Sequence, residues 1–108
     1  MTEEVSLFLE LSEPLLGSGR AEEGTMMGFP CLRTDGAFFA TTDHRSGDLI
    51  VKLPADRVDE LIGEGIGEPF APAGRRFKEW VAVRDRDRER WEALLAEALE
   101  FVAGGNHD

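Results

Sequence analysis

Cationic and aromatic side chains gather in one short stretch near the end of the chain. Arg75, Arg76 and Lys78 lie close together, and Trp80 follows. Such cations bind phosphates and carboxylates, and the aromatic ring offers a surface for stacking. In an extended strand, Arg76 and Lys78 would share one face with Trp80, whereas Phe77 would lie on the other face. The stretch predicts either a contact for nucleic acid or another anion, or a turn whose arginines offset an acidic surface. We favour the turn, because duplex binding usually needs more neutralised phosphates than three side chains supply.

The remaining reactive side chains do not form a catalytic or metal-binding motif. Cys31 is the single cysteine, and the histidines that could activate it are His44 and His107. Asp43, His44 and Asp48 fall in one expected turn, but a structural zinc site needs four ligands, mostly nitrogen or sulfur. No nucleophile elbow, phosphate loop or dinucleotide fingerprint occurs in the sequence. We therefore expect no catalytic residues, no metal and no cofactor.

Two adjacent aromatic residues predict an apolar surface. Phe38 and Phe39 stand next to each other in an expected strand, so alternation places them on opposite faces of the sheet. One of them therefore packs under a helix on the other side or is exposed, where it could serve self-association or a partner. Met26, Met27 and Phe29 could line a pocket with this pair, but we favour the core for half of the five.

Composition limits the class of protein. The 108 residues suffice for one domain, spanning 1–108, and 42% of them are hydrophobic, which is enough for a core. The 22 acidic residues exceed the 12 basic ones and give a net charge of −10, which repels nucleic acid at long range. A single cysteine and the lack of a long apolar run predict a cytoplasmic protein that does not enter the membrane.

The pattern of apolar residues, prolines and glycines predicts helices at both ends and strands between them. Asp35-Gly36 is a hairpin turn signal, and Asp85 or Asp87 suits the cap of the last helix. The expected elements begin with a helix from residue 3 that Pro14 limits or restarts, whose apolar face Leu15 and Leu16 continue up to a break at 17–19. They go on with extended pieces from 22 to 42, a strand at 48–53, a helix beginning at Pro54, extended pieces at 68–72 and 77–83 joined by a turn at 72–76, and a final helix through Val102.

This order predicts an α+β fold. The short connections favour an antiparallel sheet of five to six strands, with helices packed on one face as a second layer. They are too short for crossovers between parallel strands, except around the second helix. The other face of the sheet would be exposed to solvent, or would bind a partner or a second subunit.

Several short segments occur in the order typical of one known family. They are Met26-Met27-Gly28, Ala37-Phe38-Phe39-Ala40, Leu49-Ile50-Val51-Lys52-Leu53-Pro54, Arg57-Val58-Asp59-Glu60-Leu61, Glu68-Pro69-Phe70 and Lys78-Glu79-Trp80-Val81. In order and spacing, residues 20–103 resemble the N-terminal domain of the TfoX/Sxy family and the related YjbR (MmcQ-like) proteins. The resemblance implies the YjbR fold, similar to secretion-chaperone-like domains. It also implies a regulatory or DNA-binding role, although the helical second domain of full-length competence regulators has no counterpart here.

Together these features predict a non-enzymatic binding or regulatory module. The leading hypothesis is an interaction with an unknown protein, or with a second copy as a homodimer, through the open face of the sheet. The alternative is DNA binding of the YjbR type through Arg75, Arg76, Lys78 and Trp80. An enzyme is the less favoured reading, since it rests on no motif.

Overall fold

The computed structural model describes residues 3–26, 29–43, 46–71 and 74–104. Within these residues, three helices and six strands follow one another in the predicted order. They are α1 (Glu3–Gly17), β1 (Glu22–Met26), β2 (Phe29–Thr34), β3 (Ala37–Thr42), β4 (Leu49–Lys52), α2 (Ala55–Gly63), β5 (Gly67–Pro69), β6 (Trp80–Val83) and α3 (Arg88–Gly104). The α+β class predicted from the sequence is thereby confirmed.

The strands form one antiparallel sheet in the order β1-β2-β3-β4-β6-β5. β6 lies between β4 and β5 and runs antiparallel to both, so β4, α2 and β5 make a crossover that skips one position. This is the one crossover that the connection lengths predicted. The two edge strands are β1, which begins with Glu22 and Glu23, and β5, which is three residues long and ends with Pro69.

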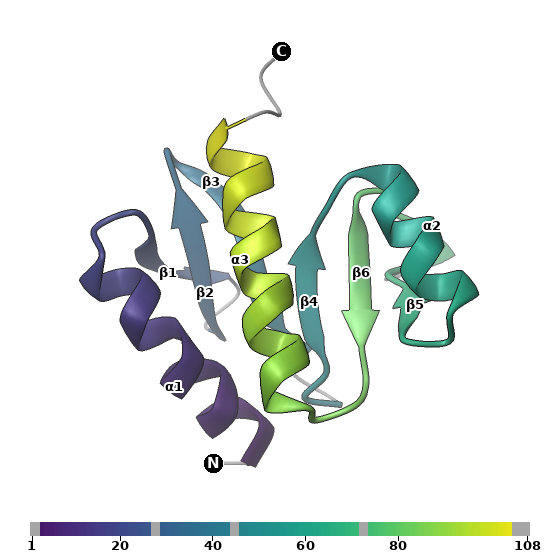
Figure 1. Ribbon diagram of the computed structural model, residues 1–108, viewed down its shortest axis with the longest axis horizontal. Coiled ribbons are helices and arrows are strands. Elements are labelled where there is room, and N and C mark those ends of the chain that lie inside the picture. Colours follow the sequence, from purple (N-terminus) through teal and green to yellow (C-terminus); the bar gives the residue numbers. More distant parts are fainter. Residues whose placement is uncertain (1–2, 27–28, 44–45, 72–73, 105–108) are drawn as a thin grey trace.

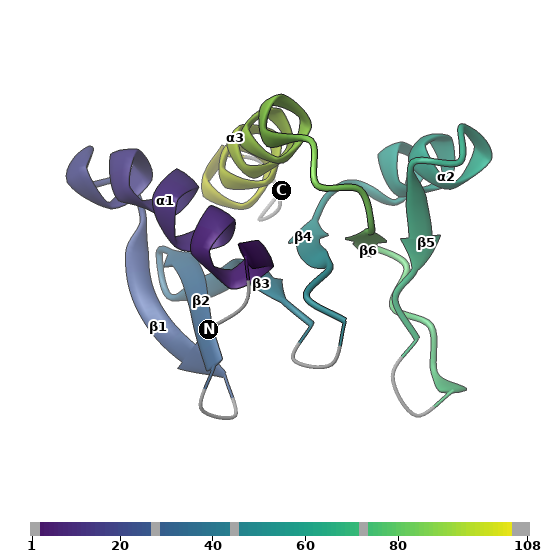
Figure 2. The same cartoon turned by 90° about the horizontal axis from the view of Figure 1, so that it is seen from below.

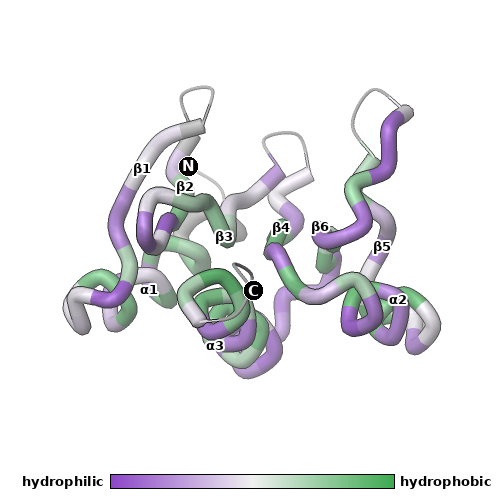
Figure 3. The backbone as a smooth tube through the Cα atoms, turned by 90° about the horizontal axis from the view of Figure 1, so that it is seen from above, coloured by the Kyte–Doolittle hydropathy of each residue, from purple (hydrophilic) through white to green (hydrophobic). Residues whose placement is uncertain are grey.

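All three helices cover the same face of the sheet. In Figure 1, α3 crosses in front of the strands, with α1 and α2 on either side of it. Figure 2 shows the helices as one layer, while the connection from β5 to β6 extends away from them. Figure 3 shows more hydrophobic residues on the side of α3 that faces the sheet and more hydrophilic residues on its outer side. None of the helices in the described part of the chain has the length and apolar character needed to cross a membrane.

Strand pairing gives the sheet two different faces. The row Leu32, Ala40, Val51 and Val81 runs across four paired strands and belongs to the core under the helices. The neighbouring row points the other way, because side chains alternate along a strand. It consists of Cys31, Thr41, Ile50 and Ala82. We call the side that carries this second row the open face.

A bulge decides where the adjacent phenylalanines lie. Leu32 pairs with Ala40 but Arg33 pairs with Phe38, which leaves Phe39 as an extra residue in β3. Phe39 and Ala40 are both fully buried in the core, whereas Phe38 shares the open face with Arg33 and is half-buried. The apolar surface predicted for the pair is therefore limited to Phe38.

The first helix ends at the predicted break but passes through Pro14 without interruption. Pro14 neither ends nor restarts α1, which continues to Gly17. Proline removes one hydrogen bond from a helix interior, but leucines on both sides of it, Leu11 and Leu15, contact the core and hold the turn in place. The side chains of Met26, Met27 and Phe29, which were considered for an apolar pocket, lie outside the described residues.

Gly67→Ala should destabilise the protein, because a Cβ at this position would lie 2.5 Å from a methyl group of the buried Val81. Overpacking of this kind costs about 1–3 kcal/mol of the free energy of unfolding. Gly63→Ala is the matched control, since its Cβ would meet open space within α2 and improve helix propensity. Urea unfolding of both variants measures the difference. Equal stabilities would contradict the close approach of β5 to β6.

Candidate functional site

The connection between β5 and β6 folds back onto the open face. The Phe77 N–H donates to the carbonyl of Phe70 at 3.0 Å, and the Trp80 N–H donates to the carbonyl of Phe77 at 3.1 Å. This turn delays the start of β6 until Trp80. The prediction of a strand from residue 77, with Phe77 and Trp80 on opposite faces, was therefore wrong. Both side chains line one cavity.

Aromatic side chains form the wall of this cavity, which encloses about 200 Å³. We call it the aromatic cavity, and its lining consists of Thr41, Ile50, Phe70, Phe77 and Trp80. The ring centroid of Phe70 lies 6.0 Å from that of Phe77 and 6.4 Å from that of Trp80, within the range of favourable ring contacts. Phe77 is 38% exposed, which makes it the exposed large hydrophobic residue of the described part of the chain.

The lining offers no charge to a ligand. Its one hydroxyl, on Thr41, donates to the carbonyl of Pro30 at 2.9 Å. Next to the cavity, Lys52 is paired with Trp80 across the strands and lies 3.9 Å from the carboxylate of Glu79. The aromatic cavity is therefore suited to a neutral apolar group.

The structure separates the predicted cationic cluster. The Arg75 guanidinium lies 5.6 Å from the ring centroid of Phe77, at the rim of the aromatic cavity. Arg76 instead forms an ion pair with Asp59 of α2 at 3.0 Å. Lys78 is exposed. Of the four residues singled out in the sequence, Trp80 lines the cavity and Arg75 reaches its rim, while Arg76 serves a contact within the protein.

Another cation lies at the far end of the open face. The side chain of Arg33 extends over Gly24. A Cβ atom at position 24 would lie only 3.3 Å from the Arg33 Cδ, so a larger residue there would have to displace the arginine slightly. The guanidinium lies 3.5 Å from Glu22, and the buried Nε has no hydrogen-bond partner among the described residues. Arg33 and Phe38, which are paired across β2 and β3, form a second patch on the open face, and this one combines a charged and an apolar side chain.

The residues considered for catalysis or metal binding are not brought together where the structure describes them. Cys31 is fully buried on the open face, and burial raises the pKa of its thiol. Asp48 lies 3.3 Å from Arg86 in an ion pair, while His44 and His107 lie outside the described residues. The described part of the chain holds no group of three or more side chains suited to a metal.

Comparison of the chain with protein-family models, curated proteins and solved structures finds no match. The site must therefore be interpreted from its own geometry. Sequence reasoning found Trp80 but missed Phe70, Phe77 and Ile50 as its neighbours in the cavity. The prolines and glycine at 69–74 predicted a turn before β6, but not that Phe70 and Phe77 would lie beside Trp80.

The stability of the folded protein should fall more steeply with pH above about 8.5 than that of Cys31→Ala. The raised pKa of the buried thiol means that the unfolded chain loses its proton first, so the stabilisation is complete below that pH and is lost as the pH rises through the folded-state pKa. Urea unfolding at several pH values measures both slopes. Parallel slopes, or rapid reaction of the native thiol with Ellman's reagent, would contradict the burial of Cys31.

Proposed function

We propose that the protein is a non-enzymatic interaction module whose open face binds a segment of a partner protein. One apolar side chain of the partner enters the aromatic cavity, and an acidic residue beside it contacts Arg75 and Lys78. The observation that carries this proposal is the exposure of Phe77 beside an uncharged aromatic cavity.

The size of the aromatic cavity favours a side chain over a small-molecule ligand. At about 200 Å³ it is smaller than the roughly 300–1,000 Å³ of a typical ligand pocket. Interfaces commonly gain most of their affinity from one such aromatic or apolar anchor in a pocket. An isolated leucine, proline or phenylalanine of a partner fits this description.

The distribution of charge favours an acidic flank on the partner. The three helices contain eleven acidic and three basic residues, whereas the rest of the chain contains eleven and nine. The open face therefore points away from the most acidic layer. Arg75 and Lys78 have no carboxylate partner among the residues that the structure describes. A carboxylate next to the apolar anchor would supply one.

DNA binding has less support. Arg76 is paired with Asp59, so two of the three clustered cations, Arg75 and Lys78, lack a carboxylate partner among the described residues. Duplex affinity grows with the number of phosphates neutralised. The acidic helices add long-range repulsion. Membership of the TfoX N-terminal and YjbR-like group, with a regulatory role in the cytoplasm, remains our proposal from the order of the sequence segments.

Panning a random peptide library against the protein should enrich peptides with one apolar residue beside aspartate or glutamate. Phe77→Ala should weaken binding of an enriched peptide at least tenfold, because it removes a wall of the cavity. Fluorescence anisotropy with a labelled peptide measures the change. Leu15→Ala is the matched control, since Leu15 is a half-buried apolar residue of α1 in the helix layer, and it should leave the affinity unchanged.

Two results would overturn this proposal. One is an equal loss of affinity in Phe77→Ala and Leu15→Ala, which would mean that the cavity does not hold the anchor. The other is a concentration-dependent dimer in sedimentation velocity that Phe77→Ala abolishes, because the occupant of the open face would then be a second copy of the chain.

Titration with labelled duplex and single-stranded DNA should show no tight binding even at low salt. Arg75 and Lys78 should give only a shallow dependence of affinity on salt. Arg75→Ala/Lys78→Ala serves as the comparison. Tight binding with a steep salt slope that this double variant removes would favour the DNA-binding alternative instead.

A further inference from the structure

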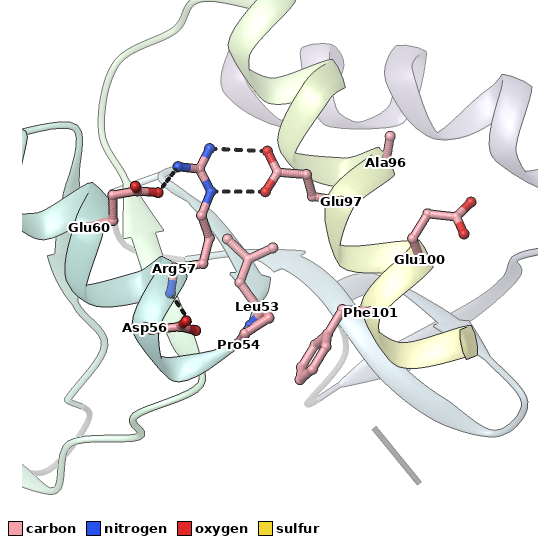
Figure 4. Close-up of a pocket in the computed structure, with 9 residues that line it drawn as sticks. All are labelled: Leu53, Pro54, Asp56, Arg57, Glu60, Ala96, Glu97, Glu100 and Phe101. Carbon is pink, nitrogen blue, oxygen red and sulfur yellow. Dashed lines mark hydrogen bonds and ion pairs between the residues drawn. The ribbon is translucent and has the colours of Figure 1, made fainter. Parts of the chain in front are cut away.

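A second cavity lies on the opposite side of the molecule, between α2 and α3. It is a shallow depression of about 870 Å³ that is widely open to solvent. Figure 4 shows its lining, with residues of α2 on one side and of α3 on the other. We call it the helix groove, and its lining residues are Leu53, Pro54, Asp56, Arg57, Glu60, Ala96, Glu97, Glu100 and Phe101.

An ion-pair bridge connects the two walls of the helix groove. The Arg57 Nε and Nη2 donate to the two carboxylate oxygens of Glu97 at 2.9 and 3.1 Å, and Nη1 donates to Glu60 at 2.5 Å. The hydrogen bonds to Glu97, and to a smaller extent the one to Glu60, raise the pKa of the guanidinium. A bidentate pair of this kind fixes the distance between the helices. The groove is therefore present before any ligand arrives.

The walls of the groove are acidic. Four carboxylates line it, from Asp56, Glu60, Glu97 and Glu100, against the single guanidinium of Arg57. Glu100 also pairs with Arg20 at 2.6 Å outside the groove, and this pairing lowers the pKa of the Glu100 carboxyl. Glu60, Glu97 and Glu100 thus have arginine partners, and Asp56 has no cationic side chain beside it among the described residues. The four carboxylates still outnumber the two guanidinium groups of Arg57 and Arg20.

Below the bridge the groove is apolar. Figure 4 shows Leu53, Pro54 and Phe101 together on the side of the bridge away from Ala96. Leu53 is fully buried and Phe101 is half-buried against the core. The accessible part of this floor is formed by Pro54 and Phe101, beside the carboxylates of the walls, and this combination suits an amphipathic occupant.

We propose that the helix groove binds a cationic amphipathic segment of a partner protein. Its apolar side chain rests on Pro54 and Phe101, and its lysines or arginines face Asp56, Glu60 and Glu100. This occupant is opposite in charge to the one proposed for the open face, and the two sites lie on different sides of the sheet. The module can therefore hold two different partners at once.

The test uses labelled helical peptides of defined composition. A peptide built from leucine and lysine should bind the protein at low salt, and one in which serine replaces leucine should bind about tenfold more weakly. A leucine and glutamate peptide should not bind. Anisotropy at low and high salt measures the affinities, and binding should weaken as salt shortens the screening length from about 30 Å at 0.01 M to about 8 Å at 0.15 M. Equal binding of the lysine peptides with leucine and with serine would overturn the proposal, because the apolar floor would then contribute nothing.

Matched charge variants locate the site. Asp56→Asn/Glu60→Gln should weaken binding of the leucine and lysine peptide about fivefold, because two carboxylates of one wall are lost. The asparagine keeps the side-chain oxygen that accepts a hydrogen bond from the backbone N–H of Arg57. Glu23→Gln/Glu92→Gln removes the same charge from exposed positions outside the groove and should leave the affinity within about twofold. An equal loss in both double variants would mean that the peptide responds to net charge alone.

A further readout does not depend on any variant. Carbodiimide joins carboxylates directly to amines, so the bound peptide should become linked to Asp56, Glu60 or Glu100. Mass-spectrometric mapping of the linked residues measures this. Links mainly to Glu10 or Glu13 of α1 would overturn the assignment to the helix groove.

Discussion

The pairing of β4 with β6 is the constraint on which both proposed binding surfaces depend. It sets Val51 beside Val81 in the core, and on the other face it sets Ile50 beside Ala82. The N–H of Leu53 extends the ladder by donating to the carbonyl of Glu79 at 2.8 Å. As a result, the same two strands support Trp80 on one side and the floor of the helix groove on the other.

This pairing joins segments that are distant in sequence, so it must form through the crossover of α2. Val58 and Leu61 of α2 are buried in the core and hold the helix over the sheet. Closing such a connection costs chain entropy, which burial of apolar side chains offsets. The sites are therefore properties of the folded sheet rather than of any one segment.

Local signals predicted much of the fold from sequence. Asp35 and Gly36 both adopt positive φ in the expected hairpin turn, and the side chain of Asp87 accepts the N–H of Arg90 at the start of α3. The aromatic cavity could not be predicted in the same way. Strict alternation placed Phe77 away from Trp80, whereas a turn brings them together, closed by the hydrogen bonds from Phe77 to Phe70 and from Trp80 to Phe77. Alternation also fails at bulges, which is why Phe39 joins Ala40 in the core.

The edges of the sheet have a consequence for how the protein can assemble. A free strand edge offers unpaired N–H and carbonyl groups to other chains, which is a common route to fibrils. Here one edge begins with Glu22 and Glu23, whose like charges would repel a second copy. The other edge is only three residues long and ends with Pro69, which has no N–H to donate. Both edges of the sheet therefore carry features that disfavour its growth from molecule to molecule, and with it the formation of fibrils.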